Sequence, residues 1–206
     1  MRPFKFDISP ILQLIFEPLS ELKALFVLLL TSVSTFLYME QARIVREAFA
    51  TREARMAAFA NIDLVVQISA LIIQIFLTAK IAQFFKLTAL LGVLGFVICA
   101  GFVVLIFTHP AFLPLAVVMS VRRVGEYALV KPGREMLFVP LSSDEKYKVK
   151  SFIDTVIYRG GDALWAQFES LLASVSITLV LGVGAFVSFV WGLLGVFLGK
   201  RYEKTT

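Results

Sequence analysis

Long apolar runs separated by short polar or proline-containing segments make up most of this chain. A bilayer core about 30 Å thick is crossed by roughly 20 apolar residues of α-helix, and runs of that length recur. A short amphipathic stretch, Ile11–Leu19, precedes the first run, and His109-Pro110 and Pro140 interrupt later ones. The pattern predicts an all-α membrane protein forming one domain over residues 1–206, with six transmembrane helices at about 22–49, 53–85, 87–108, 111–139, 146–173 and 176–199.

The six predicted helices are of two kinds. The third has no charged residue between Thr88 and Phe107, and the sixth has none between Leu171 and Gly199. The other four carry ionisable groups inside their spans, and each such group costs about 2.5–3.5 kcal/mol at bilayer depth. Together they imply about 20 kcal/mol that ion pairs or a hydrated lumen must offset. The eight groups counted lie on the second, fourth and fifth helices and are Asp63, Arg122, Arg123, Glu126, Lys131, Asp154, Arg159 and Asp162.

Helical spacing collects the polar residues into stripes. Residues three or four positions apart share one face of a helix. The order along the chain is polar, polar, apolar, then polar, polar, apolar. This order matches a 3+3 inverted repeat that forms one half of a major-facilitator-type transporter, with the third and sixth helices facing lipid. The stripes are Asp63, Gln67, Ala70, Gln74 and Thr78; Arg123, Tyr127, Lys131 and Arg134; and Thr155, Arg159, Asp162, Ala166 and Glu169.

Two points along the polar helices predict irregular backbone. Pro132 and Gly133 lie side by side within the fourth span, where proline removes a backbone hydrogen bond and predicts a kink or break. Lys131 and Arg134 flank that point. On the fifth helix Gly160-Gly161 allows close helix approach or unwinding. Irregular backbone beside cationic side chains predicts a site for a polyanion.

Composition excludes several classes of function. Hydrophobic residues make up 59% of the chain, and the mean hydropathy is +0.86. One cysteine and one histidine argue against a disulfide framework, a metal site and a catalytic triad. The chain has no phosphate loop, HExxH or GxSxG motif. We therefore expect no enzymatic activity and no cofactor, and we expect the scattered net charge of +5 to reflect the lipid bilayer, not nucleic acid.

The distribution of basic residues predicts the orientation. With the N-terminus inside, ten Lys and Arg residues fall in cytoplasmic segments, against two, Arg52 and Arg55, in outside connections. This positive-inside bias places both termini in the cytoplasm. The ten residues are Arg2, Lys5, Lys80, Lys86, Lys146, Lys148, Lys150, Lys200, Arg201 and Lys204.

Four segments carry a resemblance to a known family. They are FLYMEQARIVREAF from Phe36, REARMAAFANIDL from Arg52, EYALVKPGREMLFVPLSSDEKYKVKSFID from Glu126 and YRGGDAL from Tyr158. Over about 80% of the chain, the sequence resembles the C-terminal half of the nucleotide translocases. These are the ATP/ADP antiporters of plastids and obligate intracellular bacteria, and the likeness is greatest to their broader bacterial relatives. The resemblance implies a major-facilitator-like fold, exchange of ATP for ADP or of another nucleotide pair, and a bacterial inner membrane.

The resemblance also implies site residues. The family's Lys/Arg-Glu-Met element falls on Arg134, Glu135 and Met136, and its lysine-rich stretch falls on Lys146, Lys148 and Lys150 before Ile153 and Asp154. Where plastid members have a lysine beside the glycine pair, this chain has Arg159. Twelve helices form the family fold, so six helices imply a partner: a homodimer or a separately encoded N-terminal half. The candidate substrate contacts are Lys131, Arg134, Arg159, Arg123 and Tyr158, and the candidate coupling or ion-pair residues are Glu126, Glu135, Asp154, Asp162 and Asp63.

Other interpretations of the same residues stay open. The fourth-helix charges are equally typical of ion pairs that fix packing, such as Arg122 with Glu126 or Arg123 with Asp154. The end of the first helix, with Glu40, Arg43, Arg46 and Glu47, is typical of a solvated, salt-bridged helix end or an extracellular gate. His109 is expected to be a loop residue at an interface. The alternative function is a membrane scaffold or sensor that uses the fold without transport; a transporter of a non-nucleotide anion is a third possibility.

Overall fold

The protein is all-helical in the part of the chain that the computed structural model describes, residues 18–76, 86–137 and 151–204. Residues 11–17 of the predicted amphipathic stretch, the predicted helix end at 77–85 and the lysines 146, 148 and 150 lie outside the described residues. The elements are α2 (Pro18–Ala48), α3 (Arg52–Phe76), α5 (Leu87–Thr108), α6 (Phe112–Gly125), η1 (Glu126–Val130), α7 (Lys131–Leu137), η2 (Ile153–Ile157), α9 (Tyr158–Val175) and α10 (Ile177–Glu203).

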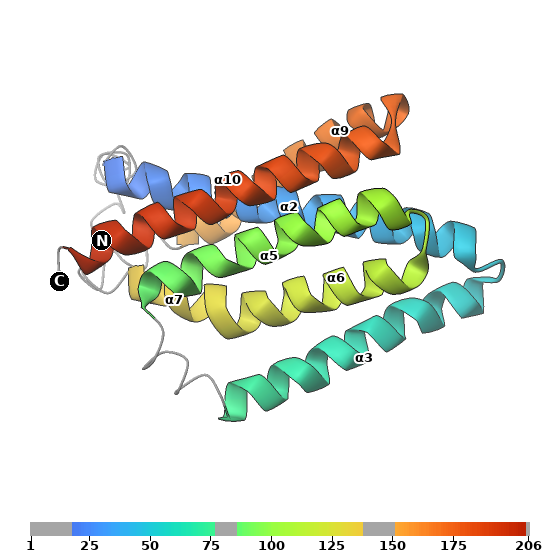
Figure 1. Cartoon of the computed structure of the whole chain (residues 1–206), viewed down its shortest axis with the longest axis horizontal. Coiled ribbons are helices and arrows are strands. Elements are labelled where there is room, and N and C mark those ends of the chain that lie inside the picture. Colours follow the sequence, from blue (N-terminus) through green and yellow to red (C-terminus); the bar gives the residue numbers. More distant parts are fainter. Residues whose placement is uncertain (1–17, 77–85, 138–150, 205–206) are drawn as a thin grey trace, which may run out of the picture.

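Four of these helices are long and apolar enough to cross a bilayer, which indicates a membrane protein. They are α2, α3, α5 and α10. The predicted fourth and fifth spans are also helical, but they carry more charge. The fourth comprises α6, η1 and α7, the fifth comprises η2 and α9, and η1 and η2 are π turns. All six segments run side by side and alternate in direction (Figure 1). The turns after α2, α5 and α9 lie at one end of the bundle, and α2 begins and α10 ends at the other.

Helices α5 and α10 form the tightest contact of the bundle. A Cβ atom on Gly95 would lie 2.5 Å from Cα of Gly192, and one on Gly195 would lie 2.4 Å from the carbonyl oxygen of Leu91. Small residues at these positions let two membrane helices approach backbone to backbone. At its end, Glu203 accepts hydrogen bonds from the backbone N–H and hydroxyl of Thr88, both at 3.0 Å. We call the contact formed by Gly92, Gly95, Gly192, Gly195 and Gly199 the glycine seam.

The opposite faces of these two helices are exposed and apolar. On α10 they present Phe186, Phe189 and Phe197, and on α5 they present Val97 and Phe107. Each helix is therefore buried on one side and exposed on the other. Only the outer faces of α5 and α10 are therefore available to lipid, because their inner faces form the glycine seam.

The predicted irregular backbone near Pro132-Gly133 takes the form of a π turn. Pro132 has no N–H, and its ring would clash with the carbonyl of Ala128 one turn back in a regular helix. The chain widens over Glu126–Val130 instead, so that the N–H of Lys131 bonds to the carbonyl of Glu126 five residues back. The helix continues without interruption into α7, and the predicted break is wrong. A π turn is a common solution near functional sites.

Candidate functional site

The charged residues of the polar helices line two cavities that adjoin at Arg122 and Arg123. The larger has a volume of about 580 Å³ and lies among α2, α3, α6 and α9. Its lining combines hydroxyl, amide and charged groups with a few apolar side chains. It is lined by Ser34, Thr35, Tyr38, Met39, Gln41, Phe59, Asp63, Met119, Arg122, Arg123, Asp162 and Ala166.

The smaller cavity is the more cationic of the two. It has a volume of about 390 Å³ and lies beside η1, α7 and η2. Four basic side chains face two carboxylates there, so the ionised lining carries an excess of two positive charges. Its lining residues are Arg122, Arg123, Glu126, Tyr127, Lys131, Arg134, Asp154 and Tyr158.

Two cross-helix ion pairs neutralise arginines of this site. Arg123 on α6 pairs with Asp63 on α3, and Arg134 on α7 pairs with Asp154 in η2. The carboxylate side chains are 57% exposed at Asp63 and 41% exposed at Asp154. The predicted pairing of Arg123 with Asp154 is therefore wrong, because each has another partner. The exposure of both carboxylates keeps these pairs accessible to water and to competing anions.

A third pair lies deeper. Arg122 donates a hydrogen bond of 3.1 Å to Glu126 one turn further along the helix, and the side chains are only 8% and 12% exposed. This predicted pair is confirmed. A guanidinium in such a position requires its carboxylate, because an isolated buried charge is strongly disfavoured.

The remaining predicted residues divide by position. Lys131 is exposed at the smaller cavity, with Nζ 3.8 Å from the ring centre of Tyr127, a cation–π arrangement. Tyr158 lines the same cavity and is half-buried. Asp162 accepts a 2.9 Å hydrogen bond from the hydroxyl of Thr35 on α2 and lines the larger cavity. Glu135 is exposed on α7 and is not part of either lining.

Arg159 lies outside both linings, although it was predicted to contact substrate. It is exposed on α9, as is Gly160 beside it. The next residue, Gly161, makes the predicted close helix approach: a Cβ atom there would lie 2.7 Å from Oγ1 of Thr31 on α2. The glycine pair thus places α9 against α2 with Arg159 turned outward.

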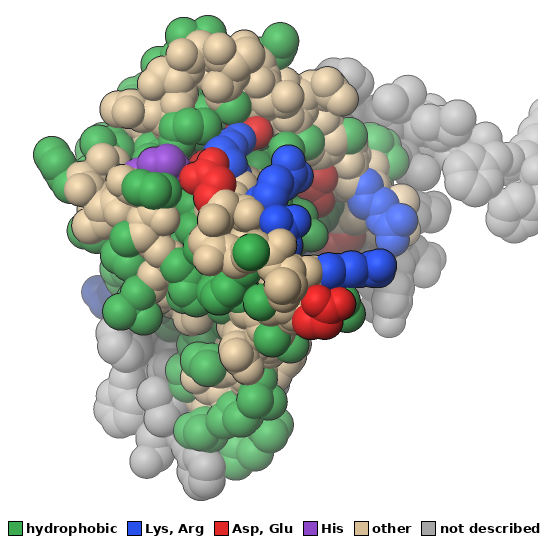
Figure 2. Space-filling view, turned by 90° about the vertical axis from the view of Figure 1, so that its right-hand side faces the viewer, with side chains coloured by type: hydrophobic (Ala, Val, Ile, Leu, Met, Phe, Trp, Pro, Cys, Tyr) green, Lys and Arg blue, Asp and Glu red, His purple; other side chains and the backbone are tan. Residues whose placement is uncertain are grey.

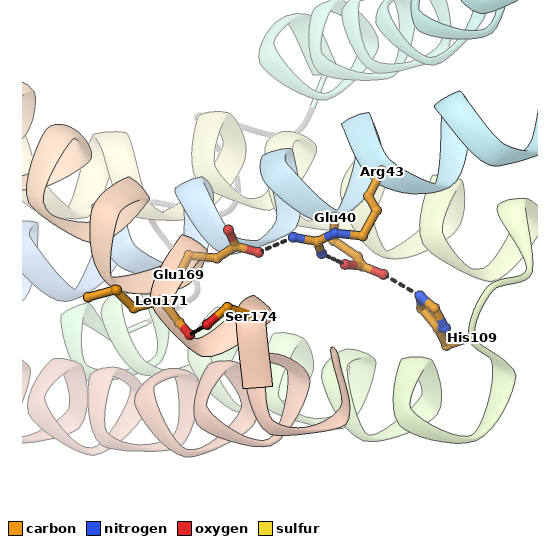
Figure 3. Close-up of polar contacts among 6 residues, drawn as sticks. All are labelled: Glu40, Arg43, His109, Glu169, Leu171 and Ser174. Carbon is orange, nitrogen blue, oxygen red and sulfur yellow. Dashed lines mark hydrogen bonds and ion pairs between the residues drawn. The ribbon is translucent and has the colours of Figure 1, made fainter. Parts of the chain in front are cut away.

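A second polar cluster combines Glu40 and Arg43, from the predicted salt-bridged end of the first helix, with Glu169 and His109, which were not predicted to join them. Arg43 on α2 donates hydrogen bonds to Glu40 and, at 2.7 Å, to Glu169 on α9. Nε2 of His109, directly after α5, lies 2.8 Å from the other oxygen of Glu40. Figure 3 shows the guanidinium between the two carboxylates, with the imidazole on the far side of Glu40.

Burial corrects one part of the interpretation of the α2 end: its salt bridges are present, but Glu40 is not solvated. The side chains of Glu40 and Glu169 are both 0% exposed, whereas Arg46 and Glu47 are exposed. Only the last turn of α2 is therefore a solvated helix end. The sequence contained two signals: Glu169 is the one charged residue in the segment 163–175, and His109 is the one histidine of the chain.

Charged side chains also gather on the end of the molecule that bears the turns after α2, α5 and α9. Figure 2, which looks onto the end that bears the three described turns, shows basic side chains side by side at the centre. Acidic side chains lie beside them and deeper in the hollow, and apolar side chains surround the group. Within residues 18–76, 86–137 and 151–204, no group of three His, Cys, Asp or Glu residues has the arrangement needed to hold a metal ion.

Comparisons with protein-family models, curated proteins and solved structures found no match to this chain. The case for a function therefore depends on the cavities, the ion pairs and the chemistry of their residues.

Proposed function

We propose that this protein transports nucleotides, or a related phosphorylated anion, across a bacterial inner membrane, with both termini in the cytoplasm. The observation that carries the proposal is the smaller cavity, where four cations face two carboxylates. Phosphate groups are bound best by guanidinium and ammonium groups in a partly desolvated pocket. Tyr127 and Tyr158 add aromatic surface that suits a nucleobase.

The ion pairs supply a means of exchange. In the empty protein, Asp63 and Asp154 neutralise Arg123 and Arg134, so that no isolated arginine is left at bilayer depth. An entering phosphate competes for the same guanidinium groups and releases the carboxylates. Departure of the phosphate restores the pairs. The carboxylates thus displace the bound phosphate again, a step that every cycle of exchange requires.

The packing of the helices supports a major-facilitator-like 3+3 arrangement. In chain order, helix one packs on helices five and six, and helix four packs on helices two and three. If helices one, two and three are exchanged with helices four, five and six, the contacts of helix one become those of helix four. The contact between helices three and six, α5 and α10, is unchanged by this exchange. Such a unit is half a transporter. A second copy or a separate N-terminal half completes the passage, and the exposed Arg159 contributes only to that shared passage.

The test is nucleotide exchange in proteoliposomes loaded with unlabelled ADP and given labelled ATP, ADP or GTP outside. We expect uptake that requires internal nucleotide and is reduced at least tenfold in Arg134→Ala and Lys131→Ala. The control is Lys200→Ala, an exposed lysine near the end of α10, which should transport normally. Absence of uptake of every nucleotide, with the homodimer and with an added partner half, would reject the substrate class.

A second candidate is a membrane scaffold or sensor that does not transport. The three ion pairs favour it, because each arginine of the cavities already has a carboxylate. This function predicts that removing both members of a pair is tolerated. Arg134→Ala with Asp154→Ala discriminates: a scaffold keeps its folded stability and its partner, whereas a nucleotide carrier loses exchange.

A further inference from the structure

The cluster of Glu40, Arg43, His109 and Glu169 joins three parts of the bundle. Glu40 and Arg43 come from α2, Glu169 comes from α9, and His109 lies in the turn between α5 and α6. The guanidinium donates to both carboxylates, and the imidazole contacts the first carboxylate from the other side (Figure 3). A change in any one member therefore affects the contact of α2 with two other elements.

The ionised cluster is not neutral. Two carboxylates and one guanidinium leave one negative charge when the imidazole is neutral. The surrounding elements do not compensate it: residues 112–120 of α6 and 177–199 of α10 contain no charged residue. Arg55 of α3 donates at 2.7 Å to the carbonyl of Phe49, and Arg46 and Glu47 of α2 are exposed. A buried, unbalanced charge is strongly disfavoured.

Two positions in the cluster have room for a proton. Nε2 of His109 and Oε1 of Glu40 are 2.8 Å apart, and neither atom has a geometrically satisfied hydrogen bond among the described residues. A proton on Nε2 makes this contact attractive, and the neutral imidazole can supply that proton itself without changing the charge of the cluster. Oε2 of Glu169 is also buried and has no hydrogen-bond partner. A single added proton, on the imidazole or on a carboxyl, makes the cluster neutral.

We infer that these four residues form a proton-binding site, and that its proton holds α9 and the α5–α6 turn against α2. The site is separate from the cavities and does not depend on what they carry. With the proton bound, the cluster is neutral and closed. When the proton leaves, the remaining negative charge favours hydration, and the elements separate at this end. The protein thereby gains a link between pH and its shape, of the kind that couples a carrier to a proton gradient.

Proton binding is tested by infrared difference spectra of the whole protein in lipid nanodiscs, recorded between acidic and alkaline buffer. We expect a carboxyl or imidazolium band that titrates in the wild type and is lost or displaced in Glu169→Gln. In that variant the charges of Glu40 and Arg43 already cancel, so no added proton is needed for neutrality. Glu47→Gln, an exposed residue two turns further along α2, is the matched control and should leave the band unchanged. If all three proteins give the same spectrum, the site does not bind a proton.

The structural consequence is tested by spin labels on Ala48→Cys in α2 and Ser174→Cys in α9, both exposed, with Cys99→Ser to remove the native thiol. The label distance should increase as pH rises in the wild type and should stay at its low-pH value in Glu169→Gln. His109→Gln keeps a neutral donor beside Glu40, so it should move the midpoint to lower pH by about one unit, a tenfold loss of proton affinity. This variant also serves if Glu169→Gln does not fold. A distance independent of pH in the wild type, or a midpoint unmoved by both variants, overturns the inference.

Discussion

Arg134 pairs with Asp154 across the smaller cavity, and so links the helix that follows one π turn to the other π turn. Both π turns occur where polar residues of different helices meet. The pair therefore holds together two parts of the backbone that already depart from regular α-helix geometry. A phosphate that replaces Asp154 as the partner of Arg134 would release the η2 segment. Substitution of Asp154 is therefore the most direct test of exchange.

Asp154→Asn should separate binding from exchange. Without the competing carboxylate, Arg134 is available to an anion, and nucleotide affinity should rise by up to about fivefold, since a partly exposed ion pair contributes about 0.2–1 kcal/mol. The exchange rate should fall, because nothing displaces the bound phosphate. Calorimetric titration with ADP and the proteoliposome assay measure the two effects. Glu53→Gln, an exposed carboxylate at the start of α3, is the control; weaker binding in Asp154→Asn would show that the pair only maintains packing.

Glu126→Gln should destabilise the fold more than any change in the exposed pairs. It leaves Arg122, whose side chain is 8% exposed, without a carboxylate. Breaking a buried pair in this way costs about 3–5 kcal/mol. The midpoint of denaturant unfolding in detergent measures the loss. Replacing both residues, Arg122→Met with Glu126→Leu, should recover most of it, and a double variant as unstable as the single one would contradict this account.

Gly161→Ala should push α9 away from α2. The new methyl group meets Thr31 at 2.7 Å and Leu28 at 3.0 Å. The adjacent Trp165 donates a 3.0 Å hydrogen bond to the carbonyl of Leu28, so its fluorescence should change in a Trp191→Phe background. Gly160→Ala is the matched control, since a Cβ there has nothing within 4 Å. Equal spectra for the two alanine variants would show that α9 does not depend on this approach.

Gly195→Ala should weaken the α5–α10 contact. Its Cβ would lie 2.4 Å from the carbonyl oxygen of Leu91, a backbone atom that cannot rotate aside. Overpacking of this kind costs about 1–3 kcal/mol. Gly182→Ala on the same helix, where a Cβ has nothing within 4 Å, should be neutral or stabilising, because alanine favours helix over glycine by about 1 kcal/mol. Thermal unfolding in detergent compares the two variants, and a Gly195→Ala protein as stable as Gly182→Ala refutes the close contact.

The helical segments follow from apolar run length, whereas the site does not. The runs place both ends of α5 at the observed residues, Leu87 and Thr108, because Lys86 and His109 bound the apolar run. Stripe patterns also place Arg123 and Lys131 on a common lining. The ion-pair partner of Arg123 could not be predicted in the same way. Arg123 and Asp63 come from different helices, and the rotation of each helix about its axis decides whether Asp63 or Asp154 is within reach.

The Glu40–His109 contact illustrates the limit more clearly. Nothing in the local pattern distinguishes Glu40 from Glu47, which lies two turns away on the same helix. Glu40 is buried because α9 and the α5–α6 turn cover it, and Glu47 remains exposed because they do not extend that far. Burial of this kind depends on tertiary packing between distant segments. It is visible only once the helices are placed in space.

The glycine seam restricts where the bundle can move. A contact made by backbone atoms has no side-chain rotamers to rearrange, so α5 and α10 must behave as one rigid body. The charged helices contact their neighbours through side chains and ion pairs, which have alternative arrangements. Any rocking that admits a solute must therefore occur on the charged side of the molecule, with the apolar pair as the stationary wall against which the other helices pivot.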